Sequence, residues 1–246
     1  MEIKRILIFQ HLRIEHPGIF REFFKEDGIE STIVELDEGD EIPALKGFDA
    51  LWVMGGPMDV WDEAEYPWLI DEKAAIRKVV CELKIPFVGI CLGHQLLADA
   101  LGGEVGSGNH AEVGVMAIHK TDSGKQSPYL ESLPDKMNCL QWHSAEVKSA
   151  PPGMEVLSYS EKCAIQSLSL GAQVFTMQYH QEIITSTVSD WSTIPAYKDA
   201  LEKSLGENAV NKLEQDALDN IDDFNKTARK LYENWKLMVL NYSFHE

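Results

Sequence analysis

Short apolar runs alternate with longer amphipathic segments over the first hundred residues. The apolar runs, which we predict to be strands, are residues 3–10, 31–36, 49–56 and 86–90. The amphipathic segments, which we predict to be helices, are residues 16–28, 66–84 and 92–103. The run PFVGI at 86–90 is apolar throughout, as expected for a central strand covered on both faces. This order predicts an α/β fold with a mostly parallel central sheet and helices on both of its faces.

The pattern changes after Gly103. Turns separate five further apolar runs, residues 112–120, 136–143, 155–160, 163–170 and 172–180. We predict that these runs add antiparallel strands and that the last one returns to the main sheet.

From about Ser189 the sequence becomes polar and helical, with apolar residues three and four positions apart. A segment of this length hardly makes a core of its own. We therefore predict one domain at residues 1–188 and a helical extension at 189–246 that packs on it.

The composition and charge of the chain exclude some classes of function. Hydrophobic residues make up 44% of the chain and charged residues 25%, and the formal net charge is −18. An acidic surface repels phosphate backbones, which argues against nucleic-acid binding. The apolar runs are too short to cross a bilayer, and the N-terminus does not read as a secretory signal, so we predict a cytoplasmic protein with four reduced cysteines.

One of the cysteines has an unusual setting. Cys91 lies between two glycines in GICLG, where a predicted strand meets a predicted helix. This is the pattern of a nucleophile elbow, a sharp turn that projects a reactive side chain at the carboxyl end of the sheet. The helix N-terminus favours the thiolate, and the N–H of Leu92 points the same way as an oxyanion donor. The structural alternative is a buried cysteine in a tight turn.

A thiol nucleophile needs a base, and His180 is our candidate. It ends an apolar strand, and Glu182 two residues later projects to the same side of an extended chain, where it can orient the imidazole. His94 and His110 are weaker candidates, and His143 is better placed to line the pocket. A metal site built from His143, His180 and Glu182 is a further alternative, but it leaves the elbow unexplained.

A second oxyanion donor is available after another strand. The turn Gly55-Gly56-Pro57 follows the apolar run 49–56, and its N–H groups can face the elbow across adjacent strand ends. The alternative is an ordinary turn. The double glycine matches neither common phosphate-binding pattern.

Three segments together resemble the class I, or triad, glutamine amidotransferase family. They are GGP at 55–57, GICLGHQ at 89–95 and QYHQE at 178–182, and the resemblance covers roughly residues 1–185. ALGGEV after the elbow and QWHSAEV at 141–147 also look like family segments.

The resemblance implies a flavodoxin-like α/β domain, a catalytic triad and no metal or cofactor. The triad would consist of Cys91 as nucleophile, His180 as base and Glu182 as its orienting acid. The oxyanion hole would use the N–H groups of Gly56 and Leu92. The residues implied around the substrate are Gly55, Gln95, Trp142, His143 and Ser144, of which 142–144 would act largely through backbone.

Two positions depart from the family pattern. Gln181 stands where proline is common, which loosens the turn between His180 and Glu182. Ser144 stands where glycine is frequent, which puts substrate contacts there in doubt. No synthetase segment follows the resemblance in the sequence, which ends in the helical tail.

The implied activity is hydrolysis of the γ-amide of glutamine, or of a γ-glutamyl compound, through a γ-glutamyl thioester. One form is an amidotransferase that passes ammonia to a separate synthetase or acceptor subunit. The alternatives are a free-standing γ-glutamyl hydrolase or peptidase of a small metabolite, and a non-catalytic binding protein that retains the fold.

Overall fold

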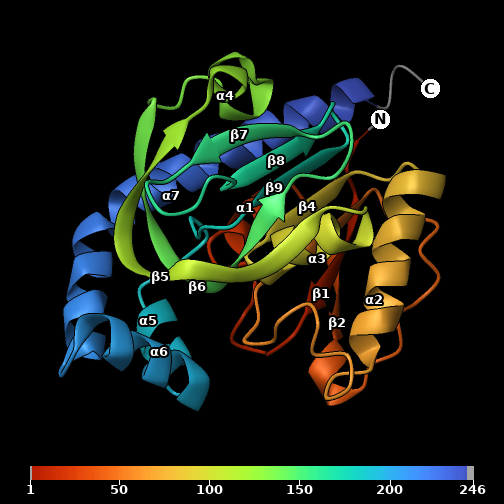
Figure 1. The fold of residues 1–246 in the computed structure, drawn as a ribbon. Helices are drawn as coiled ribbons and strands as arrows, with labels where there is room; N and C mark the ends of the chain where they lie inside the picture. The colour runs from red at the N-terminus through yellow and green to blue at the C-terminus, as the bar shows by residue number, and fades with distance from the viewer. Residues whose placement is uncertain (1, 243–246) are drawn as a thin grey trace.

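The computed structural model of the protein describes residues 2–242, which form one nine-stranded sheet with helices on both faces (Figure 1). The strands follow one another across the sheet in the order β2-β1-β3-β4-β9-β8-β7-β5-β6. The strand bounds are β1 Arg5–Gln10, β2 Glu30–Glu35, β3 Ala50–Val53, β4 Phe87–Ile90, β5 Glu104–Lys120, β6 Lys136–Ser149, β7 Glu155–Tyr159, β8 Ser167–Leu170 and β9 Val174–Met177. The α-helix bounds are α1 Phe20–Glu26, α2 Trp68–Arg77, α3 Leu92–Ala100, α4 Asp122–Gln126, α5 Thr187–Trp191, α6 Pro195–Leu205 and α7 Ala209–Tyr242.

The sheet is mixed, rather than mostly parallel as the sequence predicts. Four neighbouring pairs, β1–β2, β1–β3, β3–β4 and β4–β9, are parallel. The other four, β5–β6, β5–β7, β7–β8 and β8–β9, are antiparallel. The reason is that the chain from β5 to β9 doubles back on itself: short connections join β7 to β8 and β8 to β9, and the segment that contains α4 joins β5 to β6. The predicted return of the last strand is confirmed, because β9 lies beside β4.

Four of the parallel strands, β1, β3, β4 and β9, are buried on both faces because almost every residue in them is apolar, whereas the edge strand β2 is largely polar and exposed. In β1, Ile6 and Ile8 face a core that also contains Phe20 and Phe24 of α1. The alternate residues of the same strand face a second core, where they pack with residues of α2 and α3. The predicted helical cover on both faces is therefore present, and it fixes β3, β4 and β9 as the middle of the molecule.

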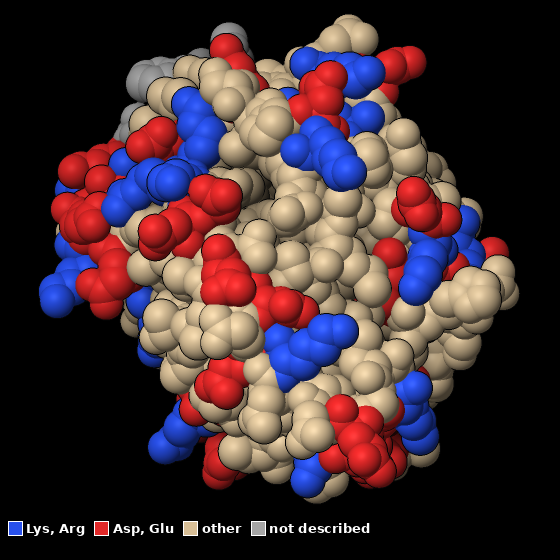
Figure 2. Space-filling model, turned by 90° about the vertical axis from the view of Figure 1, so that its left-hand side faces the viewer, with Lys and Arg blue, Asp and Glu red and all other residues tan. Residues whose placement is uncertain are grey.

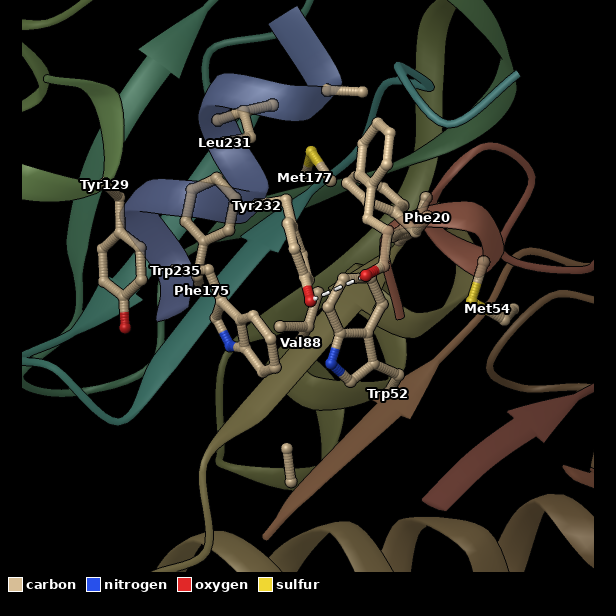
Figure 3. Packing of buried hydrophobic residues seen from close by; sticks show 14 of the residues in the cluster. Phe20, Trp52, Met54, Val88, Tyr129, Phe175, Met177, Leu231, Tyr232 and Trp235 are labelled. Atoms are coloured by element: carbon tan, nitrogen blue, oxygen red, sulfur yellow. Dashed lines mark hydrogen bonds between the residues drawn. The ribbon is translucent and has the colours of Figure 1, made fainter. Parts of the chain in front are cut away.

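Helix α7 closes the first of these cores. Tyr232 and Trp235 of α7 are buried with Trp52 of β3 and Phe175 of β9, as Figure 3 shows. The indole rings of Trp235 and Trp52 meet edge to face with centroids 5.1 Å apart. The Tyr232 hydroxyl donates to Asp27 Oδ2 at 2.5 Å and lies 3.3 Å from the backbone oxygen of Phe23. This long helix thus supplies part of the hydrophobic core beneath the central strands.

Helices α5 and α6 lie at the end of the sheet near β5 and β6 (Figure 1). Together with the start of α7 they enclose a third apolar cluster around Trp142 and Trp191. Helix α5 begins before the predicted boundary at 188/189 and runs across it. We retain the two-part division only as a proposal, with the extension packed on the domain.

The surface carries charges of both signs. Figure 2 shows one face on which acidic and basic side chains intermingle around an uncharged central area. No helix within residues 2–242 is both long and apolar enough to span a bilayer.

Candidate active site

Cys91 occupies a strained turn between β4 and α3. Its φ of 52° lies in the left-handed region, which a residue with a side chain rarely adopts. The two neighbouring glycines are needed for close packing: a Cβ on Gly89 would lie 2.5 Å from the Gly93 carbonyl oxygen, and one on Gly93 would lie 2.1 Å from the Val53 oxygen. The local sequence therefore forces the sharp strand-to-helix turn that the GICLG pattern predicts.

His180 is held beside this turn by backbone and side-chain contacts. Just beyond β9 it forms an isolated β-bridge with Leu140 of β6. Its Nδ1 lies 2.6 Å from Glu182 Oε1, and both side chains are buried. Burial disfavours the imidazolium, but the Glu182 carboxylate and the Cys91 sulfur outweigh it and raise the pKa of His180 well above 6.5. The structure thus brings together the three side chains that the sequence suggests as a triad.

The glycine turn after β3 also lies at the elbow. The N–H of Gly93 donates to the carbonyl oxygen of Met54 at 3.1 Å, which fastens the start of α3 to the end of β3. A Cβ on Gly56 would lie 2.9 Å from Leu92 Cδ2, so the two suggested oxyanion donors are neighbours. Among the described residues, neither N–H of this pair has an acceptor.

A cavity of about 180 Å³ opens over Cys91. Five of the other predicted residues line it, namely Gly56, Gln95, Trp142, His143 and Ser144. Of the remaining predicted residues, Leu92, His180 and Glu182 do not line it, and neither does Gly55. A Cβ on Gly55 would face the His180 ring at 3.5 Å and Glu15 Oε2 at 2.7 Å, so its place is behind the imidazole.

The side-chain nitrogen of Gln95 is hydrogen-bonded within the protein. Its Nε2 donates to the Ala145 oxygen at 3.1 Å and to Gln178 Oε1 at 2.9 Å. Gln178 in turn donates to the sulfur of Cys91 at 3.7 Å. Only the side-chain oxygen of Gln95 is left for a ligand, while Gln178 joins the site through the thiol.

Both ring nitrogens of His143 lie close to oxygen atoms of the protein. Its Nδ1 lies 2.9 Å from the Ala145 oxygen and its Nε2 3.2 Å from Glu112 Oε2. The described residues contain no group of three or more histidine, cysteine or acidic side chains that could hold a metal ion. The alternative of a metal site on His143, His180 and Glu182 therefore has no geometric support.

His94 contacts the sheet rather than the thiol. It is fully buried, its Nδ1 contacts Thr176 Oγ1 of β9 at 2.8 Å, and burial lowers the pKa of its imidazole to about 3. His110 is exposed on β5. Neither residue competes with His180.

Two functional candidates escape the sequence analysis. Glu15, in the segment after β1, is buried, and its Oε1 accepts a hydrogen bond from the Tyr197 hydroxyl of α6 at 2.5 Å. Burial raises the pKa of Glu15, although His180 and Tyr197 oppose the shift. Tyr197 lines the cavity. No short motif contains either residue, and they meet across 182 positions of the chain, so no local signal could have paired them.

The site occurs within a matched family segment. The glutamine amidotransferase class-I family model matches residues 19–190, which include Cys91, His180 and Glu182. A GMP synthase (glutamine-hydrolyzing) subunit from Sulfolobus acidocaldarius is 32% identical over 157 residues, which cover 63% of this chain and 78% of that one. The protein of the same name from Archaeoglobus fulgidus is 28% identical over 188 residues, covering 75% of this chain and 91% of that one.

Solved structures of glutamine amidotransferases also resemble this chain. A glutamine amidotransferase from Thermotoga maritima superposes with a TM-score of 0.84 at 28% identity, covering 95% of this chain and 98% of that one. A glutamine amido transferase from Methylobacillus flagellatus superposes with a TM-score of 0.80 at 28% identity, covering 97% of this chain and 95% of that one. The family model matches more than half of this chain. The chain therefore belongs to the class I glutamine amidotransferase family.

Proposed function

We propose that this protein hydrolyses the γ-amide of glutamine or of a γ-glutamyl compound, with Cys91 as nucleophile. The observation that carries the proposal is the strained Cys91 turn beside the buried His180–Glu182 pair, at the base of a cavity. A structural cysteine has no need of a backbone conformation that costs on the order of 1–3 kcal/mol. This cost argues against a non-catalytic binding protein.

The proposed reaction has two halves. The Cys91 thiolate attacks the side-chain carbonyl carbon, and the N–H groups of Gly56 and Leu92 stabilise the resulting oxyanion. The His180 imidazolium gives a proton to the departing nitrogen, so that ammonia or an amine leaves and a γ-glutamyl thioester remains. Water, giving its proton to His180, then attacks the thioester, which expels the Cys91 thiolate, releases glutamate and restores the thiolate–imidazolium pair.

Glu182 has a supporting role in this proposal. Its carboxylate accepts the Nδ1 proton of His180, so the ring presents Nε2 to the thiol and the substrate. It also stabilises the imidazolium that donates to the leaving nitrogen. No metal or cofactor enters any step.

The cavity also supports a second candidate, a free-standing hydrolase of γ-glutamyl amines. Part of its wall is apolar and small, with Ala111 and Val113 on β5 facing Ala196 and Ala200 on α6. Such a wall suits a leaving group larger than ammonia. The relatives named as GMP synthase subunits suggest the other form, in which a separate synthetase subunit receives ammonia.

The test is a panel of glutamine and γ-glutamyl amides scored for released ammonia or amine, with Cys91→Ala as the control. We expect turnover of at least one compound by the wild type and none by the variant. Efficient turnover of γ-glutamyl amines by the protein alone favours the hydrolase, whereas glutamine turnover that requires an added synthetase subunit favours the amidotransferase. Full activity in Cys91→Ala would refute both forms.

A further inference from the structure

A buried histidine–carboxylate pair lies directly behind the glycine turn, outside the proposed triad. His11 follows β1 and Glu72 belongs to α2, and both side chains are fully buried. His11 Nδ1 lies 2.7 Å from the carbonyl oxygen of Gly55, while Nε2 lies 3.0 and 3.2 Å from the two oxygens of Glu72. The Trp68 ring stacks on the imidazole with centroids 5.6 Å apart.

The partners of this imidazole settle which way its hydrogen bonds run. A carbonyl oxygen can only accept, so the Nδ1 of His11 carries a hydrogen and donates to Gly55. Its Nε2 faces a carboxylate, to which a protonated ring donates as well. Burial opposes the charge, but Glu72 and the Gly55 carbonyl outweigh it and raise the pKa of His11 above 6.5.

The bond to Gly55 fixes the next peptide group. The described chain contains no cis peptide bond, so the C=O of Gly55 and the N–H of Gly56 point in opposite directions from one peptide plane. With its carbonyl held by His11, this peptide directs the Gly56 N–H away from His11. Gly56 itself fits tightly between His11 and Leu92, since a Cβ there would lie 2.8 Å from His11 Cβ and 2.9 Å from Leu92 Cδ2.

The cavity lies beside this peptide, because Gly56 lines it together with Cys91. Among the described residues, the Gly56 N–H has no backbone acceptor. A glycine turn is free to rotate its peptide groups, so without an anchor the donor would be poorly aimed. An oxyanion donor works only if it is fixed before the charge develops.

We propose that His11 is a positioning residue, which through its bond to the Gly55 carbonyl aims the Gly56 N–H at the oxyanion formed above Cys91. This inference rests on the proposed function, because it assigns a support to the oxyanion hole of that reaction. His11 does not line the cavity, so in this proposal it acts through the Gly55–Gly56 peptide.

Two isosteric substitutions separate the two contacts of His11. Glutamine places its amide nitrogen near the Nε2 position, so His11→Gln keeps the contact with residue 72 and loses the donor to Gly55. Asparagine places its amide nitrogen near the Nδ1 position, so His11→Asn keeps the donor and loses the other contact. Both are made in a Glu72→Gln background, which leaves no unpaired charge in the core.

For γ-amide hydrolysis, we expect Glu72→Gln alone to remain close to wild type, because a neutral imidazole still donates through Nδ1. Adding His11→Gln should lower kcat by about 10²-fold with little change in KM, because the donor acts mainly in the transition state. Adding His11→Asn should restore most of that loss. Alkylation of Cys91 by iodoacetamide forms no oxyanion, and its rate should be the same in all variants.

The outcomes are distinguishable. Equal kcat in the glutamine and asparagine variants, or a parallel loss of kcat and of Cys91 alkylation, overturns the positioning role. If His11→Gln fails to fold, the comparison of His11→Asn with Glu72→Gln decides, since a tenfold or larger loss there contradicts the proposal. A wild-type protein that releases no amine or ammonia from any compound overturns the proposed function, and this inference with it.

Discussion

His180 is the residue on whose protonation state the proposed reaction depends most. Its Nδ1 lies 2.6 Å from Glu182 Oε1, and Glu15 and the Cys91 sulfur are close enough to interact with the ring. Two buried carboxylates beside one imidazole stabilise the positive form. The protonated ring is what the departing nitrogen needs.

Replacing Glu182 with glutamine should show this dependence. The carboxylate raises the pKa of His180, so Glu182→Gln should lower it and move the alkaline limb of the kcat–pH profile to lower pH. The value of kcat should also fall by about 10²-fold, since acid–base catalysis weakens. The exposed Glu155→Gln is the matched control, and an unmoved limb in Glu182→Gln would contradict the assignment.

The same pair makes a contribution to stability whose sign can be worked out. The pKa of His180 is higher in the folded chain than the unfolded value of 6.5. Its stabilising effect is therefore complete below 6.5 and is lost as the pH rises through the folded pKa. The free energy of unfolding of the wild type should approach that of a His180→Gln variant on the alkaline side.

At the scale of elements, the site depends on how closely α3 approaches β3 and β4. The residue that allows this approach is Gly93, whose Cα faces the Val53 carbonyl with no room for a methyl group. The bond from its N–H to Met54 fixes the same contact. A shift of α3 would move Cys91 and Leu92 together.

Gly93→Ala should therefore destabilise the fold and reduce catalysis at once. The added Cβ would lie 2.1 Å from backbone, and overpacking of this kind costs typically about 1–3 kcal/mol. Gly106→Ala on β5 is the control, because a Cβ there meets only the flexible Lys148 side chain at 3.8 Å. Urea unfolding and kcat measure the two effects, and a Gly93→Ala protein as stable and active as wild type would count against this packing.

At the scale of elements, the sequence predicts a feature when the residues that form it are adjacent in the chain. The elbow is local: an apolar strand, a cysteine between two glycines and a helix are adjacent in the chain, and the structure has the predicted strand, turn and helix in this order, although α3 ends at Ala100 and is buried almost throughout. The contacts of Glu15 with Tyr197 and of His11 with Glu72 are not local. Both depend on the parallel order of β1, β3 and β4 and on how the helices cover them, which no single segment encodes.

The whole molecule is built around the central strands, with α7 closing one side. Figure 3 shows Trp235 and Tyr232 of α7 against Trp52, Val88 and Phe175 of the sheet. The sequence predicts a tail packed on the domain from its helical spacing. It does not reveal that α7 fills the core under β3 and β4, because that depends on which face is left uncovered by α1.

We therefore propose that the chain unfolds as one cooperative unit, tail included. Trp235→Ala should lower the free energy of unfolding by about 3–5 kcal/mol, since it empties a fully buried site in the core. Leu237→Ala, two residues away and 58% exposed, should change it by no more than about 0.5 kcal/mol. Denaturant unfolding followed by fluorescence and by circular dichroism measures this, and two separate transitions would argue for an independent tail.

The mixed sheet shows which features of the whole molecule the sequence does not predict, namely how the strands pair and how long they are. Alternating strands and helices identify the parallel part, and turn-separated runs identify the antiparallel part. Their proportions depend on pairing partners, and β5 and β6 extend well beyond the runs that predict them, to 17 and 14 residues. Their extra length, residues 104–111 and 144–149, continues the antiparallel pairing past the residues 142–144 that line the cavity.

The most direct measurement of the central claim is mass spectrometry of protein quenched with acid during turnover of glutamine or a γ-glutamyl amide. The account predicts a γ-glutamyl adduct on the peptide that contains Cys91, formed as fast as ammonia or amine is released and absent in Cys91→Ala. Turnover at a comparable rate with no adduct on Cys91, or with the adduct on another residue, would contradict it.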